Sequence, residues 1–172
     1  CTASVTGANG LSGSPTVTYS ANVDVGTVTA SATYAATPNY LTSTGSKTFD
    51  ITQAATTTLV SCPASAVFTG AAIEVCTSLV TGPGLPPLNL TPAPIYSNNT
   101  NVGTATASYT YAATLNYLTS TDSKNFQITQ AATTAIVTCP VSAVYTGAAL
   151  TPCTGSVTGA GLGLTPTPVH TN

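Results

Sequence analysis

Two stretches of this 172-residue chain alternate apolar residues with threonine and serine. The apolar positions are Val28, Ala30, Ala32 and Tyr34 in the first stretch, and Ala105, Ala107, Tyr109 and Tyr111 in the second. A period of two is typical of a half-buried β-strand, whose side chains point alternately to the two faces of a sheet. The pattern therefore predicts one strand in each stretch.

Shorter apolar runs predict further strands. They lie around Phe49 and Ile51, around Phe126 and Ile128, in "TTLVSC" from Thr57, in "TAIVTC" from Thr134, in "SAVF" from Ser65 and in "SAVY" from Ser142. The Pro-rich run from Gly84 to Pro94 is predicted as an edge strand or a connection, because proline cannot donate to a ladder. No segment has a convincing helical period. Short strands separated by frequent turn signals predict an all-β fold of antiparallel β-sandwiches.

The chain also repeats itself. Residues Val25 to Thr52 match Val102 to Thr129 at 22 of 28 positions, which gives a repeat of 77 residues. "TQAATT" follows in both copies and is the predicted linker between modules. We therefore expect residues 1–55 to be the C-terminal part of one module, 56–132 a complete module and 133–172 the N-terminal part of a third.

Composition narrows the possible functions. Charged residues make up 3% of the chain, and the formal net charge is −2. Nucleic acids and anionic membranes are bound by clustered Lys and Arg, of which this chain has two in total. Since no stretch of roughly 18 apolar residues is present, no transmembrane helix is predicted. Low charge together with a positive mean hydropathy also argues against disorder.

Four cysteines form two matched pairs, Cys62 with Cys76 and Cys139 with Cys153. The spacing inside each pair suits a disulfide, which implies an oxidising compartment. Structural zinc is the alternative, but it usually includes a close cysteine pair such as CxxC. "CTASVTG" at Cys1 matches "CTSLVTG" at Cys76, so Cys1 is predicted to pair with a cysteine outside the chain; a lipid-bearing first residue is the alternative.

Two long stretches resemble the bacterial immunoglobulin-like repeats called MBG-type domains. They are Val137 to Leu162 ("VTCPVSAVYTGAALTPCTGSVTGAGL") and Tyr96 to Ala132. The resemblance implies tandem immunoglobulin-like sandwiches in a bacterial surface or secreted protein. One departure lies at a turn, where such repeats often read Gly-Asp-x-Asn and this chain has Ala36 to Asn39 and Ala113 to Asn116. An acidic role at that turn is therefore not expected.

Few side chains are candidates for chemistry. His170 stands where the other copies have Tyr19 and Tyr96, so we interpret it as a structural substitution and expect no enzyme activity. The carboxylates Asp24, Asp50, Glu74 and Asp122 are isolated in sequence, which argues against calcium and any other cofactor. An isopeptide bond between Lys47 or Lys124 and Asp24 or Asn101 is a further hypothesis; exposed lysines at a strand start are the simpler interpretation.

The sequence thus predicts a non-enzymatic structural repeat of an extracellular bacterial surface protein or fibre. Its expected partners are neighbouring modules or identical subunits, joined by strand addition or end-to-end stacking. The alternative is an adhesin that binds glycan or ice through a threonine face formed by Thr27, Thr29, Thr104 and Thr106. Asn89 and Asn98 begin N-glycosylation motifs.

Overall fold

The computed structural model describes residues 1–84 and 86–169, and it is all-β apart from a short 3-10 turn at Ala8–Gly10. Residues 1–55, the first segment, contain β1 (Val5–Thr6), β2 (Ser12–Gly13), β3 (Val17–Ser20), β4 (Gly26–Tyr34) and β5 (Ser43–Ile51). Residues 56–132, the middle segment, contain β6 (Thr57–Ser61), β7 (Ser65–Val67), β8 (Thr77–Gly82), β9 (Leu88–Leu90), β10 (Ile95–Ser97), β11 (Gly103–Tyr111) and β12 (Ser120–Thr129). Residues 133–172, the last segment, contain β13 (Thr133–Thr138), β14 (Thr154–Gly159) and β15 (Leu162–Leu164).

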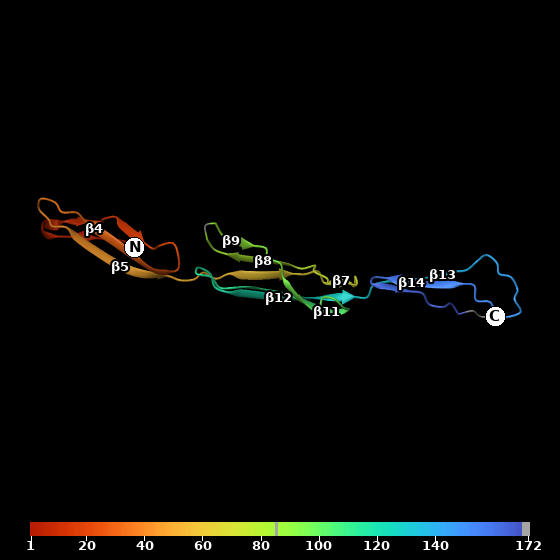
Figure 1. Cartoon of the computed structure of the whole chain (residues 1–172). Coiled ribbons are helices and arrows are strands. Elements are labelled where there is room, and N and C mark those ends of the chain that lie inside the picture. The colour runs from red at the N-terminus through yellow and green to blue at the C-terminus, as the bar shows by residue number, and fades with distance from the viewer. Residues whose placement is uncertain (85, 170–172) are drawn as a thin grey trace. The chain divides into compact units, whose positions relative to one another are not determined.

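These strands form several small sheets (Figure 1). The first segment has a β1–β2 pair and the antiparallel sheet β3–β4–β5. The middle segment has the sheets β6–β8–β9 and β10–β11–β12–β7, and the last segment has the antiparallel sheet β13–β14–β15. The all-β prediction is confirmed.

Two strand predictions need correction. "SAVY" from Ser142 forms no strand, although "SAVF" from Ser65 contains β7. The difference has a physical cause: β7 pairs with β12, and the last segment contains no strand equivalent to β12 among its described residues. The β7–β12 pair is also parallel, where we expected antiparallel pairing throughout. The Pro-rich stretch behaves as predicted, since β9 lies at the edge of its sheet.

The contacts divide the chain into two compact units. One unit consists of Cys1–Thr57, Thr81–Leu88 and Tyr111–Ser120, and the other contains Thr58–Val80, Asn89–Thr110 and the chain from Thr121 onward. Each unit therefore draws on the middle segment, and the module boundaries expected from the sequence stay a prediction.

A hydrophobic cluster in the middle segment joins side chains of its two sheets. Val60 of β6 packs with Ala105 and Ala107 of β11 and with Phe126 and Ile128 of β12. All five are at most 2% exposed. The alternating alanines of β11 are thus the buried positions that the period of two predicts. Their small size leaves space for Phe126, among the largest fully buried side chains.

Tyr96 fixes one end of this cluster. Its hydroxyl accepts a hydrogen bond from Cys76 N at 2.8 Å and donates one to Cys76 O at 3.0 Å. Its ring meets Phe126 edge-on, with centroids 6.5 Å apart. The first segment repeats this arrangement 77 residues earlier, where Tyr19 lies edge-on to Phe49 at 6.4 Å. There the amino terminus of Cys1 donates to the Tyr19 hydroxyl at 3.0 Å.

We expect the substitution Tyr96→Phe to lower the free energy of unfolding by about 1–3 kcal/mol, because both backbone groups of the half-cystine at Cys76 lose their hydroxyl partner. Chemical denaturation followed by circular dichroism measures the change. Tyr109→Phe is the matched control, since its hydroxyl makes no hydrogen bond within the described residues. Equal loss in both variants would contradict this role of the Tyr96 hydroxyl.

Candidate functional site: the disulfides and the Asn116 junction

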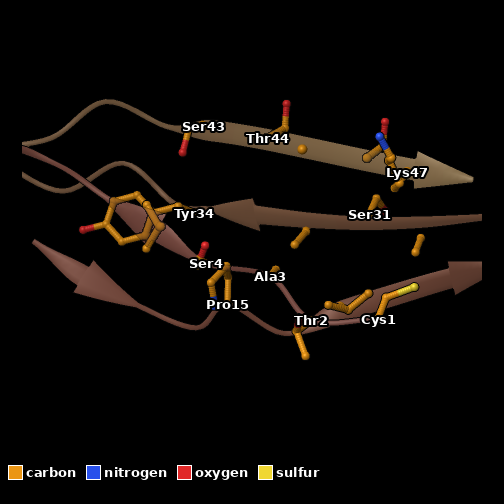
Figure 2. Close-up of a pocket in the computed structure, with 16 residues that line it drawn as sticks. Cys1, Thr2, Ala3, Ser4, Pro15, Ser31, Tyr34, Ser43, Thr44 and Lys47 are labelled. Carbon is orange, nitrogen blue, oxygen red and sulfur yellow. The ribbon is translucent and has the colours of Figure 1, made fainter.

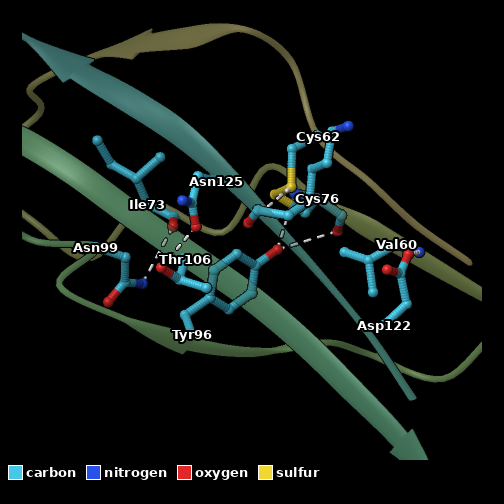
Figure 3. The surroundings of a disulfide bond; sticks show 10 residues. Val60, Cys62, Ile73, Cys76, Tyr96, Asn99, Thr106, Asp122 and Asn125 are labelled. Carbon is cyan, nitrogen blue, oxygen red and sulfur yellow. Dashed lines mark hydrogen bonds between the residues drawn. A yellow bond between two sulfur atoms is a disulfide. The ribbon is translucent and has the colours of Figure 1, made fainter.

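Cys62 and Cys76 form a disulfide at the edge of the hydrophobic cluster (Figure 3). Cys62 directly follows β6 and Cys76 directly precedes β8, so the bond ties together the ends of two strands of one sheet. Cys76 is 7% exposed and bonded to Tyr96 through its backbone. The disulfide is therefore a structural cross-link at the edge of the core.

Two further contacts secure the surroundings of this disulfide (Figure 3). Asn99 accepts a backbone bond from Ile73 N at 2.9 Å and donates from Nδ2 to Ile73 O at 3.1 Å, which fixes the loop before Cys76. Val60 N donates to Asp122 Oδ2 at 2.7 Å, which ties β6 to β12. A carboxylate that accepts a backbone N–H makes one of the stronger hydrogen bonds in a protein.

The remaining cysteines follow the same spacing. Cys139 and Cys153 form a second disulfide, again 14 residues apart in sequence. Cys1 is free and exposed. Its pairing with a cysteine outside the chain stays a prediction. Disulfides persist in oxidising compartments, so the two bonds are consistent with a secreted or extracellular protein.

A second set of contacts lies at a junction around Asn116, inside the first compact unit. The Asn116 side chain accepts from Val25 N at 2.9 Å and donates to Asp24 Oδ1 at 2.8 Å. Its backbone oxygen accepts from Ala54 N at 2.9 Å. One residue of the β11–β12 loop thus holds both the turn before β4 and the linker before β6.

The linker residues complete this junction. Gln53 Nε2 donates to Thr114 O at 2.7 Å, and Leu118 N donates to Ala54 O at 2.8 Å. Thr56 Oγ1 bonds to Leu118 O at 2.9 Å and to Ser120 Oγ at 2.8 Å. Three residues of the predicted linker "TQAATT", Gln53, Ala54 and Thr56, are therefore hydrogen-bonded to the loop that precedes β12.

The loop itself is braced by a tyrosine. Tyr117 Oη donates to Pro83 O at 2.7 Å, and Thr114 N donates to Tyr117 O at 2.9 Å. In the first segment Tyr40 Oη likewise donates to Ala8 O at 2.8 Å, and Thr37 N to Tyr40 O at 2.9 Å. The equivalent loops of the two copies are thus held by the same hydrogen bonds. The sequence placed Gln53 in a predicted linker and Asn116 in a turn, but it did not predict contacts for them or for Tyr117; their recurrence as Gln130, Asn39 and Tyr40 was the available signal.

The four carboxylates take separate places in this structure. Asp24 accepts from Asn116, Asp122 from Val60 N, and Asp50 Oδ1 from Thr27 Oγ1 at 2.7 Å. Glu74 lines a shallow groove beside Cys76. Among the described residues, no group of three or more His, Cys, Asp or Glu side chains lies together.

Most hydroxyl groups of the threonine face are hydrogen-bonded to side chains of the neighbouring strand. Thr27 donates to Asp50 of the neighbouring strand, and the equivalent Thr104 accepts from Gln127 Nε2 at 2.9 Å. Thr106 donates to Asn125 Oδ1 at 2.9 Å. These hydroxyls serve cross-strand pairing, which stabilises a sheet.

The other predicted sites lie apart from one another. Lys47 and Lys124 are exposed, and within the described part of the chain no hydrogen bond or ion pair joins either lysine to Asp24 or Asn101. Asn89, in β9, and Asn98, with φ 56°, are both exposed. His170 lies outside the described residues.

Comparisons with known proteins give no match: no family model, curated protein or solved structure is similar to this chain. The resemblance to MBG-type repeats accordingly stays a prediction. Across the described residues, the structure has no helix long and apolar enough to cross a membrane.

We expect Asn116→Ala to speed hydrogen exchange at the Val25 amide about tenfold, because that N–H loses its partner and a typical net hydrogen bond contributes about 1 kcal/mol or somewhat more. Exchange monitored by NMR gives the rate. Asn39→Ala is the control, since Asn39 is the same residue of the first copy and has no hydrogen bond within the described residues. An unchanged exchange rate at the Val25 amide in the Asn116 variant would show that this hydrogen bond does not stabilise the junction.

Proposed function

We propose that this chain is a non-enzymatic structural segment of an extracellular bacterial surface protein or fibre, built of immunoglobulin-like modules that carry tension from end to end. The observation that carries the proposal is the parallel pairing of β7 with β12. The disulfides support an extracellular setting. The partners we propose are neighbouring modules or identical subunits.

The parallel pair resists extension because of its place in the chain. β7 lies near the start of the middle segment and β12 at its end, so tension pulls the two strands in opposite directions along their axes. Three bonds add to the ladder of this pair: Gln127 N to Ala64 O at 3.1 Å, Phe68 N to Thr129 O at 2.9 Å and Thr129 Oγ1 to Ala66 O at 3.3 Å. Bonds loaded in shear break together, whereas bonds at a peeled edge break one at a time.

The disulfide and the junction around Asn116 add to this resistance to pulling. The Cys62–Cys76 bond keeps the intervening residues, which include β7, out of the length that can be pulled out once β7 has separated from β12. Contacts of Gln53, Ala54 and Thr56 with the β11–β12 loop limit movement at the linker. With so few charges, neither set depends on ion pairs, so we propose a segment whose stiffness is insensitive to salt.

The substitution Ala66→Pro should lower the force at which the middle segment unfolds by about half, because proline removes a donor at the centre of the parallel pair, opposite Ile128. Single-molecule pulling through the two chain ends measures this force. Ala143→Pro is the matched control, since it is the equivalent position of the last segment and lies in no strand. Identical unfolding forces in wild type and Ala66→Pro would refute the proposed tension-bearing role.

Reduction of the disulfide should lengthen the unfolded middle segment by about 45 Å, which is the extended reach of 14 residues less the 4.3 Å between the two Cα atoms. The same pulling experiment, run with and without a reductant, gives this increment. The double variant Cys62→Ala/Cys76→Ala should show the longer length under both conditions and lose about 3 kcal/mol of stability. An unchanged length on reduction would mean that the bond does not shield the loop.

A further inference from the structure

Two glycines bring the backbones of the middle and last segments together inside one compact unit. Gly70 lies in the loop between β7 and β8, and Gly161 lies in the turn between β14 and β15. A Cβ atom on Gly70 would lie 3.1 Å from Gly161 Cα, and a Cβ atom on Gly161 would lie 3.3 Å from Gly70 Cα. Carbon atoms in favourable contact are about 3.5–4.0 Å apart. The two backbones are therefore closer than a side chain at either position would allow unless the segments moved apart.

The loop that carries Gly70 is held to the middle segment at both ends. Thr69 Oγ1 donates to Ala71 O at 3.3 Å and accepts from Ala71 N at 3.4 Å, which closes the loop around Gly70. Before the loop, Phe68 N donates to the last residue of β12 at 2.9 Å. After the loop, Ile73 N donates to the turn between β10 and β11, also at 2.9 Å. Gly70 is thus presented to the last segment by a loop with little freedom to yield.

The turn that carries Gly161 is held equally well to the last segment. Gly159 pairs with Leu162, so the two residues between them form a tight hairpin turn. Gly159 also pairs with Thr133, the first residue of β13. A Cβ atom on Gly159 would lie 3.0 Å from Thr133 Cγ2, so the turn packs closely on the start of that strand. The turn and β13 are therefore parts of one sheet.

The glycine contact gives these two segments a second connection. The first connection is the chain itself, which leaves β12 at Thr129 and enters β13 at Thr133. A single chain connection permits rotation, because the φ and ψ angles of its residues are free to change. A second contact to one side of the linker stops that rotation. Gly70 is placed for this role, since its loop continues from β7, which lies beside β12 at a strand spacing of about 4.8 Å.

We infer that the Gly70–Gly161 contact stops rotation between the middle and last segments, an inference that rests on the proposed function of joined modules. Neither the β7–β12 pair nor the Cys62–Cys76 bond resists this motion, because both lie within the middle segment. The loop Thr69–Ala72 and the turn Thr158–Gly161 contain no charged residue, so the contact needs no ion pair.

The substitution Gly70→Asn tests this contact in the full chain. Asparagine tolerates a positive φ, as Asn9 and Asn98 show here at 55° and 56°. The loop can therefore keep its conformation at Gly70, where φ is 85°, while the new side chain has no room against Gly161. Cys1 is free and exposed (Figure 2), so it is capped with iodoacetamide in every sample to prevent disulfides between copies.

Residual dipolar couplings in an uncharged polyacrylamide gel measure the rotation. They give the degree of alignment of β13 and β14 relative to that of β11 and β12. We expect this ratio to be about one in the wild type and to fall to about half in Gly70→Asn, because a segment that rotates averages its couplings. Amide chemical shifts of β13 and β14 verify that the last segment stays folded.

Gly147→Asn is the matched control. Gly147 is the equivalent of Gly70 and has φ 78°. Apart from its chain neighbours, the closest atom of the described residues to a Cβ at that position would be Tyr145 Oη at 4.0 Å. The control should therefore keep the wild-type ratio. Gly161→Asn should lower the ratio as Gly70→Asn does, because it enters the same contact from the other side.

Three results would each overturn the inference: a ratio far below one in the wild type, an unchanged ratio in both Gly70→Asn and Gly161→Asn, or an equal fall in Gly147→Asn. If one variant lost the β13–β14 sheet, the wild-type ratio and the other variant would still decide. Gly70→Asn should leave the unfolding force of the middle segment unchanged, so the proposed function stands or fails separately in the pulling experiments.

Discussion

Hydrogen bonds between neutral side chains and the backbone hold the loops around the Cys62–Cys76 disulfide and the linker between the segments. Tyr96 bonds both backbone groups of Cys76, Asn99 holds Ile73, and Gln53 reaches Thr114 across the linker. Such bonds contribute modestly when made and cost more when a buried partner is left unsatisfied. The conformations of the loops around the disulfide and the junction are therefore set by these hydrogen bonds. The chain has too few charged residues for ion pairs to take their place.

The hydrophobic cluster explains why these bonds matter so much. Two of its residues, Ala105 and Ala107, offer only one methyl group each to bury, and hydrophobic stabilisation is proportional to the apolar area removed from water. Phe126 and Ile128 of β12 are among the largest fully buried side chains of the described residues. A segment with so small a core gains a larger share of its stability from a covalent cross-link, for which loop closure gives about 3 kcal/mol.

Much of the strand pattern could be predicted from the sequence because it depends on local periodicity. The alternation around Val28 and Ala105 fixes β4 and β11, and the match between the copies extends the same interpretation to β5 and β12. The failure at Ser142 has a different origin, since a three-residue strand exists only where a neighbour offers a ladder. The junction was missed for the same reason: Asn116 and Gln53 are ordinary polar residues until the fold brings Val25 and Thr114 beside them.

The junction also bears on how such a chain can change over evolutionary time. Its contacts join Gln53 and Ala54 to a loop in the following copy, and most of the acceptors are backbone oxygens, such as those of Thr114, Asn116 and Leu118. Backbone acceptors are present whatever the side chain, so Pro38 and Leu115 can differ at the tip of the loop while the bonding groups persist. Recombination that adds or deletes one 77-residue copy would recreate the same donors and acceptors at every new boundary, and the length of the protein can vary without the redesign of an interface.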